Sequence, residues 1–258
     1  MGGLSRYVSV LRLFSEERAD WSVAEMADAL KLPVSTVYRT VREMVATDFL
    51  ESATAARYRL GACFIEFDRL VRKTDPLYRF GTSLLRDVVM QARVPCVAFL
   101  SRLYDDRVMC IADYESAEDG VHTSYERGRP RPLTRGATAK VILAQLPPRR
   151  LSKLLESASA DATLVPKSVS KFRDELAAIR KSGYSITRSE VDKKMVGIAA
   201  PITVIDRALI GSLSLAVPAA RLDDTLERRL VLLVVSSAKL LTSELTAQPG
   251  PARAAARR

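Results

Sequence analysis

The chain of 258 residues holds few of the side chains on which most enzymes and metal sites depend. It has one histidine, His122, and three cysteines, Cys63, Cys96 and Cys110. A lone histidine argues against multi-histidine metal sites and against a serine–histidine triad. The cysteines are odd in number, widely spaced and without a C-x-x-C pair, which favours reduced, buried thiols in a cytoplasm. We therefore expect neither a metal nor a cofactor.

Long hydrophobic runs, nucleotide-binding loops and targeting signals are also missing. No apolar run approaches the roughly 20 residues of a membrane-spanning helix, since the most apolar stretch, Leu230–Val235, stops at Ser236. The N-terminus lacks the apolar core and cleavage site of a signal peptide. Neither a Walker loop nor a G-x-G-x-x-G pattern occurs. The expected location is the cytoplasm, with no membrane partner.

The net charge of +10 is unevenly distributed along the chain. Residues 1–75 hold eleven Lys and Arg and eleven Asp and Glu, so the whole excess lies beyond residue 75. A DNA-binding hypothesis therefore depends on which face the N-terminal charges occupy. The C-terminal excess either attracts an anionic ligand or only keeps the protein soluble, and both interpretations stay open.

Two short amphipathic helices are predicted near the N-terminus. Ser22 and Glu25 have the spacing of a capping box, and apolar residues follow at helical spacing as far as Leu30. Pro33 ends this segment, and a second helix is predicted at Val34–Thr47. One face of the second helix is apolar, whereas the other suits phosphate oxygens and base edges, although an ordinary solvated face has the same composition. The candidate DNA-contacting residues of that face are Ser35, Thr36, Tyr38, Arg39 and Arg42.

A basic hairpin is predicted directly after this helix. Phe49-Leu50 begins a strand, a short polar segment can turn, and Arg57–Leu60 alternates basic and apolar side chains as a half-buried strand does. Arg57 and Arg59 share one side and could neutralise phosphates, or they could be solvated arginines of an ordinary hairpin. Together, the two helices and the hairpin predict a winged helix-turn-helix.

Two further helices are predicted around this segment. The first, Arg6–Glu16, would support the helix pair, and the second, Ala62–Lys73, is apolar around much of its circumference. Such a helix is too apolar for a simple linker, so we expect it to pack on its counterpart in a second subunit. Asp75-Pro76 marks the expected domain boundary. The inner face of the first helix is predicted to consist of Tyr7, Val8, Leu11 and Phe14.

Beyond residue 76 the pattern alternates between strands and helices. Strands grouped with helices around them predict an α+β domain, in which a sheet face can hold a small ligand. Residues 247–258, rich in Ala, Pro and Arg, predict a disordered tail. Strands are expected at Cys96–Leu103, Val108–Tyr114, Val121–Tyr125, Tyr184–Arg188, Val196–Val204 and Leu209–Val217, and helices at Leu77–Arg93, Gly136–Leu146, Arg149–Ser157, Ser168–Ser182 and Arg221–Leu245.

Three blocks of sequence resemble the IclR family of bacterial transcriptional regulators. The similarity covers nearly the whole chain, and the order and spacing of the blocks make it specific. The blocks are Leu32–Arg39 with Tyr58–Gly61, then Pro132–Lys140, then Gly183-Tyr184 with Gly197–Pro201 and Ser212–Leu215.

This resemblance implies both an architecture and a set of partners. It implies a winged helix-turn-helix over residues 1–61, a linker helix over 62–75 and a GAF-like α/β effector-binding domain over 76–246. It also implies a homodimer, or a dimer of dimers, on a partly palindromic double-stranded DNA operator. The expected function is a non-enzymatic regulator whose operator binding is controlled by a small organic acid, such as a carboxylate or an aromatic acid.

The resemblance further implies a set of effector-binding residues. Backbone amides at the start of the Gly136 helix would meet a carboxylate, although packing between small residues is the alternative interpretation. Arg135 and Lys194 replace small residues of the family pattern, and we hypothesise that they pair with an anionic effector. Thr134 and Ala139 are further departures, from a histidine and a glycine. The other candidate residues are Ala137, Thr138, Thr187, Met195, Gly197, Ser214 and Ala216.

Two alternative functions remain. Ser168 and Lys171 match the S-x-x-K pattern of serine–lysine hydrolases, but that pattern is short and also suits the start of a surface helix. The second alternative is a GAF-like small-molecule sensor that acts through protein partners, with the winged helix binding a protein instead of DNA.

Overall fold

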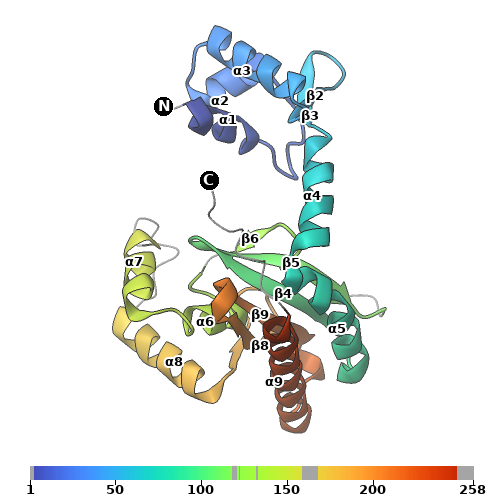
Figure 1. Ribbon diagram of the computed structural model, residues 1–258, viewed down its shortest axis with the longest axis vertical. Coiled ribbons are helices and arrows are strands. Elements are labelled where there is room, and N and C mark those ends of the chain that lie inside the picture. Colours follow the sequence, from blue (N-terminus) through green and yellow to red (C-terminus); the bar gives the residue numbers. More distant parts are fainter. Residues whose placement is uncertain (1–2, 118–120, 122, 132, 159–167, 249–258) are drawn as a thin grey trace, which may run out of the picture. The chain divides into compact units, whose positions relative to one another are not determined.

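The computed structural model describes residues 3–117, 121, 123–131, 133–158 and 168–248. The chain divides into two units, Met1–Thr74 and Asp75–Arg258, and Figure 1 shows the elements of each. Each unit has its own cluster of buried apolar side chains. His122 and residues 249–258 of the expected tail lie outside the described residues, and Ala247 still belongs to the last helix.

Three helices form most of the first unit: α1 (Gly3–Leu11), α2 (Val23–Leu30) and α3 (Val34–Ala46). The predicted capping box is confirmed, because the Ser22 hydroxyl accepts from the Glu25 amide at 3.3 Å and the Glu25 carboxylate accepts from the Ser22 amide at 2.8 Å. Lys31 ends α2 in the left-handed conformation, with φ 54°. The buried faces of α2 and α3 then pack on one another around Met26 and Val37.

The prediction for the first helix was wrong in extent and partly in its inner face. α1 ends at Leu11, because Ser15 and Arg18 exchange backbone hydrogen bonds of 3.1 and 3.2 Å and form a turn instead. Val10 is the fully buried residue of α1, whereas Val8 is partly exposed. The cause is the packing of α1 on the other two helices, which the repeat of apolar residues alone does not specify.

A small antiparallel sheet completes this fold, with strand order β1-β3-β2. The strands are β1 (Trp21–Ser22), β2 (Leu50–Ser52) and β3 (Arg57–Leu60), and Trp21 pairs with Tyr58. The hairpin closes through a 2.8 Å bond from the Ala53 amide to the Arg57 carbonyl. At its tip Ala55 and Ala56 have φ values of 57° and 55°, in the left-handed region that alanine rarely occupies.

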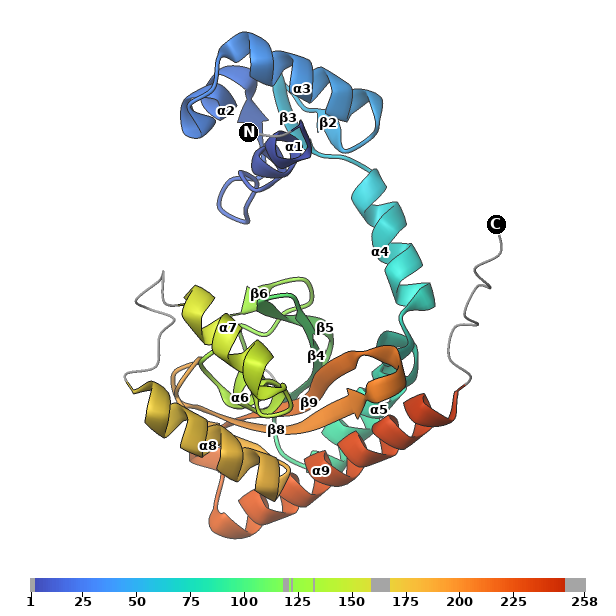
Figure 2. The same ribbon diagram turned by 60° about the vertical axis from the view of Figure 1, so that its left-hand side comes forward.

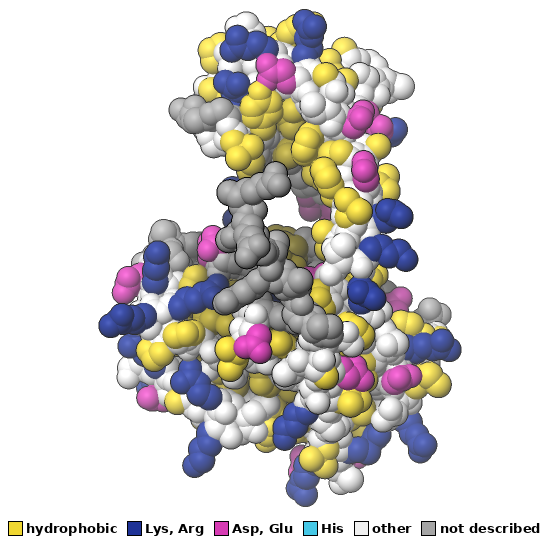
Figure 3. Space-filling view, viewed as in Figure 1, with side chains coloured by type: hydrophobic (Ala, Val, Ile, Leu, Met, Phe, Trp, Pro, Cys, Tyr) yellow, Lys and Arg dark blue, Asp and Glu magenta, His cyan; other side chains and the backbone are white. Residues whose placement is uncertain are grey.

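The helix α4 (Cys63–Thr74) leaves most of its apolar side chains exposed. Phe64 packs edge-on against Phe49, with 5.8 Å between ring centroids, and Phe67 lies 6.5 Å from the same ring. Beyond these contacts Leu70 and Val71 are exposed, and Figure 3 shows apolar side chains beside basic ones along this helix. Within the first unit, α4 therefore has an apolar surface without a covering element.

The second unit is a six-stranded antiparallel sheet with strand order β6-β5-β4-β9-β8-β7. Helices cover both faces of the sheet, which confirms the predicted α+β class. The strands are β4 (Val97–Tyr104), β5 (Arg107–Glu115), β6 (Pro130–Arg131), β7 (Ser185–Arg188), β8 (Met195–Val204) and β9 (Leu209–Pro218). The helices are α5 (Pro76–Ala92), α6 (Ala137–Leu143), α7 (Pro148–Ala158), α8 (Val169–Ser182) and α9 (Asp224–Ala247), and two short 3₁₀ turns, η1 (Ile205–Arg207) and η2 (Ala219–Arg221), flank β9.

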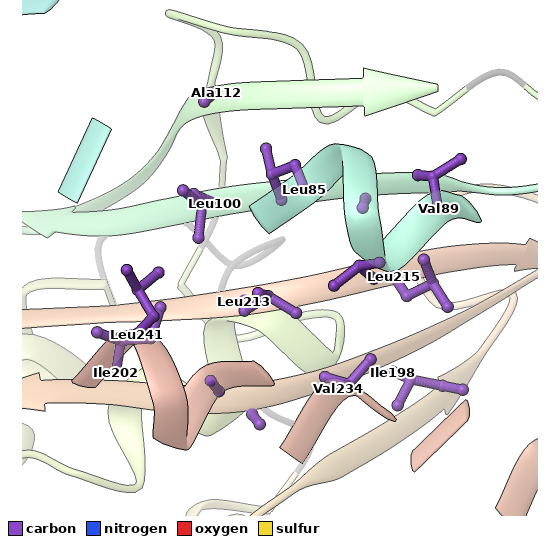
Figure 4. Close-up of a cluster of buried hydrophobic side chains, with 14 of the residues drawn as sticks. Leu85, Val89, Leu100, Ala112, Ile198, Ile202, Leu213, Leu215, Val234 and Leu241 are labelled. Carbon is purple, nitrogen blue, oxygen red and sulfur yellow. The ribbon is translucent and has the colours of Figure 1, made fainter. Parts of the chain in front are cut away.

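The sheet separates two apolar layers. Helices α5 and α9 pack on one face, where Leu85 and Leu241 meet Leu100 and Leu213 of the sheet (Figure 4). Helix α6 packs on the other face and is covered by α7 and α8 (Figure 2). The side chains of the two central strands, β4 and β9, thus point alternately into two cores. The face under α6 is the one that holds the candidate ligand cavity.

Helix α9 corrects one expectation drawn from composition. By length and composition alone it is apolar enough to span a membrane, whereas we expected no such segment. One stripe of α9, represented by Leu230, Val234 and Leu241, is fully buried against the sheet. Burial of this stripe explains the apolar composition as that of a core helix.

Two other expectations concern the connecting segments. No strand forms among the described residues of Val121–Tyr125, because Thr123 and Ser124 instead hydrogen-bond to Asp192 in a distant loop. The three cysteines are buried and free. Burial raises the pKa of the Cys96 and Cys110 thiols to about 12, which makes both unreactive at neutral pH.

Gly61 joins the wing to α4 at a point of close backbone approach. A Cβ atom there would lie 2.2 Å from the Asp48 carbonyl oxygen. We therefore expect Gly61→Ala to destabilise the first unit by about 1–3 kcal/mol, because backbone rather than a side chain must move. Urea unfolding followed by the fluorescence of Trp21, the single tryptophan, measures this change. Ala62→Ser, at an exposed neighbouring position, is the control, and equal stability of both variants would contradict the steric explanation.

Candidate functional site

The outer face of α3 presents two arginines to solvent. Arg39 and Arg42 are exposed, as is Tyr38 with 51% of its surface accessible, while Val37 and Val41 on the opposite face are buried. No carboxylate among the described residues forms an ion pair with Arg39 or Arg42. The helix therefore carries two guanidinium groups with free hydrogen-bond donors, the geometry needed to reach phosphates and guanine edges.

A shallow hollow on this face is lined by Tyr38, Arg39, Arg42, Glu43 and Ala46. The Tyr7 hydroxyl donates to the Glu43 carboxylate, which fixes the one acidic group of the hollow. Ser35 lies exposed near the start of α3. Thr36 is only half-exposed, and its backbone carbonyl accepts from the Thr40 hydroxyl at 2.9 Å.

The arginines of the wing differ from those of α3, because both have carboxylate partners. The Arg57 guanidinium lies 2.5 Å from the Asp20 carboxylate and 3.0 Å from that of Glu25. Arg59 pairs with Glu51 on the neighbouring strand, and both side chains are exposed. Arg57 thus ties β3 to the N-terminus of α2, so its charge is compensated within the unit.

A second candidate site is a small cavity between α6 and the sheet of the second unit. Its volume is about 30 Å³, which holds one or two water molecules but no organic acid. The Tyr125 side chain fills the adjoining space and stacks on Phe99, with 4.6 Å between ring centroids. The cavity is lined by Phe99, Thr123, Tyr125, Gly136, Ala137, Thr138, Thr187, Glu190, Val191, Asp192, Met195, Gly197 and Ala216.

The backbone amides at the start of α6 already have acceptors. The Gly136 amide donates to the Glu190 carboxylate at 3.0 Å, and the Ala137 amide donates to the Thr187 hydroxyl at 3.1 Å. These are the amides that were predicted to receive an effector carboxylate. A protein carboxylate therefore occupies the positive end of this helix in the structure.

Glu190 also pairs with a buried lysine. The Lys140 ammonium lies 2.7 Å from the Glu190 carboxylate and 2.7 Å from that of Glu175 on α8. Desolvation lowers the pKa of Lys140, but the hydrogen bonds to the two glutamates outweigh it and the net pKa is raised. Lys140 therefore stays charged and anchors α6 to α8 and to the loop between β7 and β8.

The structure gathers most of the predicted effector residues around this cavity. Ser214 does not line the cavity itself, but its hydroxyl is 3.0 Å from that of Thr138, which does. Arg135 lines a second cavity of about 60 Å³, and its guanidinium donates to the Glu190 carbonyl at 2.5 Å. Lys194 is exposed and lines neither cavity, so the proposed pairing of Lys194 with an effector finds no geometric support. The predicted residues that line the first cavity are Ala137, Thr138, Thr187, Met195, Gly197 and Ala216.

Several lining residues were not predicted, namely Phe99, Tyr125, Glu190, Val191 and Asp192. The signal that could have identified Glu190 is the lysine at position 140, since a charged residue inside a helix of small and apolar residues needs an acidic partner. No comparable signal marks Tyr125, which we had assigned to a strand. Among the described residues, no group of three or more His, Cys, Asp or Glu side chains could hold a metal ion.

Comparison with known proteins agrees with this arrangement. Residues 87–242 match the family description "Bacterial transcriptional regulator IclR C-terminal", and residues 3–53 match "IclR helix-turn-helix domain". The chain belongs to the IclR family of transcriptional regulators. The N-terminal helix-turn-helix and the C-terminal α/β domain expected from the sequence are thereby confirmed.

Sequence similarity to other members of the IclR family extends over most of the chain. It is 27% identical to the probable regulator ArcR of Halobacterium salinarum over 223 residues, which are 84% of this chain and 83% of the relative. It is 25% identical to the transcriptional repressor IclR of Escherichia coli over 251 residues, or 93% and 88% of the two chains.

Solved structures share the fold. A putative IclR regulator from a Silicibacter species has a TM-score of 0.80 at 21% identity and covers 97% of this chain, with 98% of its own length matched. An IclR homologue from Microbacterium hydrocarbonoxydans, crystallised with 4-hydroxybenzoate, has a TM-score of 0.78 at 21% identity, with 95% and 99% of the two chains covered.

The cap of α2 generates a pH-dependent prediction. The hydrogen bond from the Ser22 amide, supported by Arg18 and Arg57, lowers the pKa of Glu25 from 4.5 to about 2. A lowered native pKa means that the carboxylate stabilises the fold above pH 4.5 and that this contribution is lost as pH falls towards 2. We expect Glu25→Gln to remove this part of the pH dependence and to lower stability at pH 7.

Urea unfolding between pH 2.5 and 7, followed by Trp21 fluorescence, tests this expectation. Asp28→Asn, an exposed acid on the same helix, is the matched control and should keep the wild-type pH dependence. An unchanged slope in Glu25→Gln would show that the carboxylate does not couple folding to pH.

Proposed function

We propose that this IclR-family protein binds a partly palindromic operator as a dimer and that a small organic acid in the second unit controls the binding. The observation that carries this proposal is the exposed face of α3, where Arg39 and Arg42 have no carboxylate partner among the described residues. Because such a regulator acts on chromosomal DNA, the proposal includes a cytoplasmic location.

The two groups of arginines have different roles in this proposal. Arg39 and Arg42, with Ser35, Thr36 and Tyr38, lie in the major groove and read base edges. Arg59 is exposed and can exchange Glu51 for a phosphate at small cost, since exposed ion pairs contribute little. Arg57 contributes chiefly by holding the wing on α2, because its guanidinium is engaged by Asp20 and Glu25.

The proposal of an acid effector is supported by the cavity under α6. Its apolar wall contains Phe99, Met195 and Ala216, and its polar wall contains Thr138 and Thr187. This lining, although not the present volume of about 30 Å³, suits a flat molecule with one polar end. The homologue from Microbacterium hydrocarbonoxydans was crystallised with an aromatic acid of this shape, 4-hydroxybenzoate.

The geometry around Ser168 favours a regulator over a serine–lysine hydrolase. The Ser168 hydroxyl accepts from the backbone amide of Lys171 at 3.4 Å and caps α8. The S-x-x-K pattern is therefore explained as the start of a helix. This supports a protein without hydrolase activity, in agreement with its family.

The proposed dimer is supported by the exposed apolar side of α4. At 100° per residue, Phe67, Leu70 and Val71 lie within an arc of about 100°, and all three are exposed. Such a stripe on a surface helix is typical of a helix–helix interface. The partner that fits is α4 of a second copy. In a two-fold dimer the apolar stripes of the two α4 helices pack against each other, so both are buried.

The DNA-reading role of α3 generates the first test. Arg39→Ala should weaken binding to an operator, selected from a random-sequence library, by about 1–3 kcal/mol and should relax the sequence preference. Fluorescence anisotropy with the selected fragment and with a scrambled fragment measures both effects. Arg86→Ala, an exposed arginine of the second unit, is the control. Equal losses on both fragments would assign Arg39 to phosphate contact only, and no loss would remove α3 from the interface.

The dimer generates the second test. Leu70→Glu combined with Val71→Glu should convert a dimer into a monomer with the 28.5 kDa chain mass, because like charges would face each other across the interface. Light scattering after gel filtration measures the mass. Arg69→Glu, on the opposite side of the same helix, should leave the dimer intact. A dimer that persists in the double variant would place the interface elsewhere.

A further inference from the structure

The segment from Ser124 to Arg131, which ends with β6, contains an unusual concentration of buried polar atoms without partners. Among the described residues, the Ser124 hydroxyl, the Tyr125 hydroxyl and the Arg131 Nε are buried and make no hydrogen bond of normal geometry. Buried polar groups in folded proteins nearly always have partners, so three exceptions within so short a segment call for an explanation. Tyr125 lines both cavities of the second unit, and Arg131 lines one of them.

Tyr125 separates these two cavities. Together with Glu190 and Val191 it lines both the inner cavity of about 30 Å³ and the outer cavity of about 60 Å³. Its side chain is 5% exposed, and its ring stacks on Phe99 at an interplanar angle of 18°. If the ring swung out, the two cavities and the volume of the ring would form one chamber with a flat aromatic floor.

The Tyr125 ring is held by few polar contacts. Burial raises the pKa of its hydroxyl to about 12, although the nearby Thr138 hydroxyl opposes this shift without making a hydrogen bond of normal geometry. Arg131 lies over the ring, with its guanidinium carbon 5.5 Å from the centroid. Stacking on Phe99 and burial therefore hold the Tyr125 ring in place. The ring of an aromatic ligand could make the same stacking contact and be buried in the same space.

The backbone on both sides of Tyr125 is anchored independently of its ring. Thr123 and Ser124 donate to the Asp192 carboxylate at 2.7 and 3.1 Å, and the Gly128 amide donates to the Cys110 carbonyl at 2.9 Å. A rotation of the side chain about its own bonds breaks none of these hydrogen bonds.

The charges at the two ends of the chamber set the orientation of a ligand. The Asp192 carboxylate lies at the inner end, whereas Glu190 lines both cavities and is paired with Lys140. The amides of Gly136 and Ala137 at the start of α6 already have acceptors. At the outer end lie Arg131 and Arg135, neither of which forms an ion pair with a carboxylate in the described part of the chain. A carboxylate is therefore repelled from the inner end and attracted to the outer one.

We propose that Tyr125 is a built-in occupant of the effector site and that the effector is an aromatic monoacid whose ring replaces it. The incoming ring stacks on Phe99, and its carboxylate lies between Arg131 and Arg135 at the outer end. This inference rests on the proposed effector-controlled function and specifies the ligand orientation and the residue that must move. The site is self-occupied without effector and opens only when Tyr125 leaves.

When Tyr125 occupies the site, the effector can bind only the fraction of molecules in which the site is open. The apparent Kd for the effector is then the intrinsic Kd divided by that fraction. Tyr125→Ala removes the competing ring and should lower the Kd for benzoate by at least about tenfold, if fewer than one molecule in ten is open at equilibrium. Tyr125→Phe keeps the ring and should change the Kd less than about twofold. Isothermal titration calorimetry of the full-length protein measures both values.

The movement of Tyr125 can be observed without relying on the alanine variant. Protein labelled with 3-fluorotyrosine gives one fluorine resonance for each of the eight tyrosines, and the resonance missing in Tyr125→Phe identifies this residue. Saturating benzoate should move that resonance from a buried to a solvent-exposed chemical shift. Benzoate that binds while the resonance stays in place would overturn the proposal and leave effector control intact.

The orientation is tested with a matched pair of ligands. Arg131→Ala and Arg135→Ala should each weaken benzoate binding about tenfold, the loss of one charge-assisted contact, and should leave binding of p-cresol, which has no carboxylate, unchanged. Arg129→Ala is the control, because this partly exposed arginine is near in sequence but lines neither cavity. Equal losses for both ligands would overturn the assigned orientation.

Two outcomes separate this proposal from the function on which it rests. Tighter benzoate binding by Tyr125→Ala together with Arg39-dependent operator binding supports both. Weaker benzoate binding by a folded Tyr125→Ala, or no binding by either form, overturns self-occupancy, whereas Arg39-dependent operator binding would still establish the DNA-binding role.

Discussion

A buried ammonium group fixes the geometry of the effector unit. Lys140 is 7% exposed, and a charge at such depth costs several kcal/mol unless carboxylates and hydrogen bonds compensate it. Glu175 brings α8 to Lys140, and Glu190 brings the loop between β7 and β8. Because Glu190 also accepts from the Gly136 amide, one side chain determines where α6 begins and how the cavity wall lies.

The same constraint explains the charge pattern of the effector site. The positive end of α6 is occupied by the Glu190 carboxylate, and in the proposed orientation Arg131 and Arg135 at the outer cavity bind the anion instead. Sequence similarity alone pointed to the amides of α6 for this role. Glu190, 54 residues away in the chain, accepts from the Gly136 amide instead, which is the observation behind the proposed orientation.

Local features of the fold followed from the sequence, and long-range ones did not. The capping box of α2 was predictable because Ser22 and Glu25 are three residues apart and act on one helix turn. The pairing of Arg57 with Asp20 spans 37 residues, and the strand β1 is only two residues long, so neither leaves a periodic pattern. Tyr125 was misassigned because an apolar residue at a strand-like spacing looks the same whether it belongs to a sheet or fills a cavity.

The tip of the wing has a consequence for how the protein fits a duplex. Two successive alanines, Ala55 and Ala56, hold left-handed backbone angles that cost roughly 1–2 kcal/mol per residue relative to glycine. Their methyl side chains offer no polar group to fix this shape, and backbone hydrogen bonds from the Ala53 amide to the Arg57 carbonyl and from the Arg57 amide to the Thr54 carbonyl close the tip. If the wing contacts DNA as proposed, a change in the shape of this tip would release backbone strain, which favours a wing that adapts to grooves of different width.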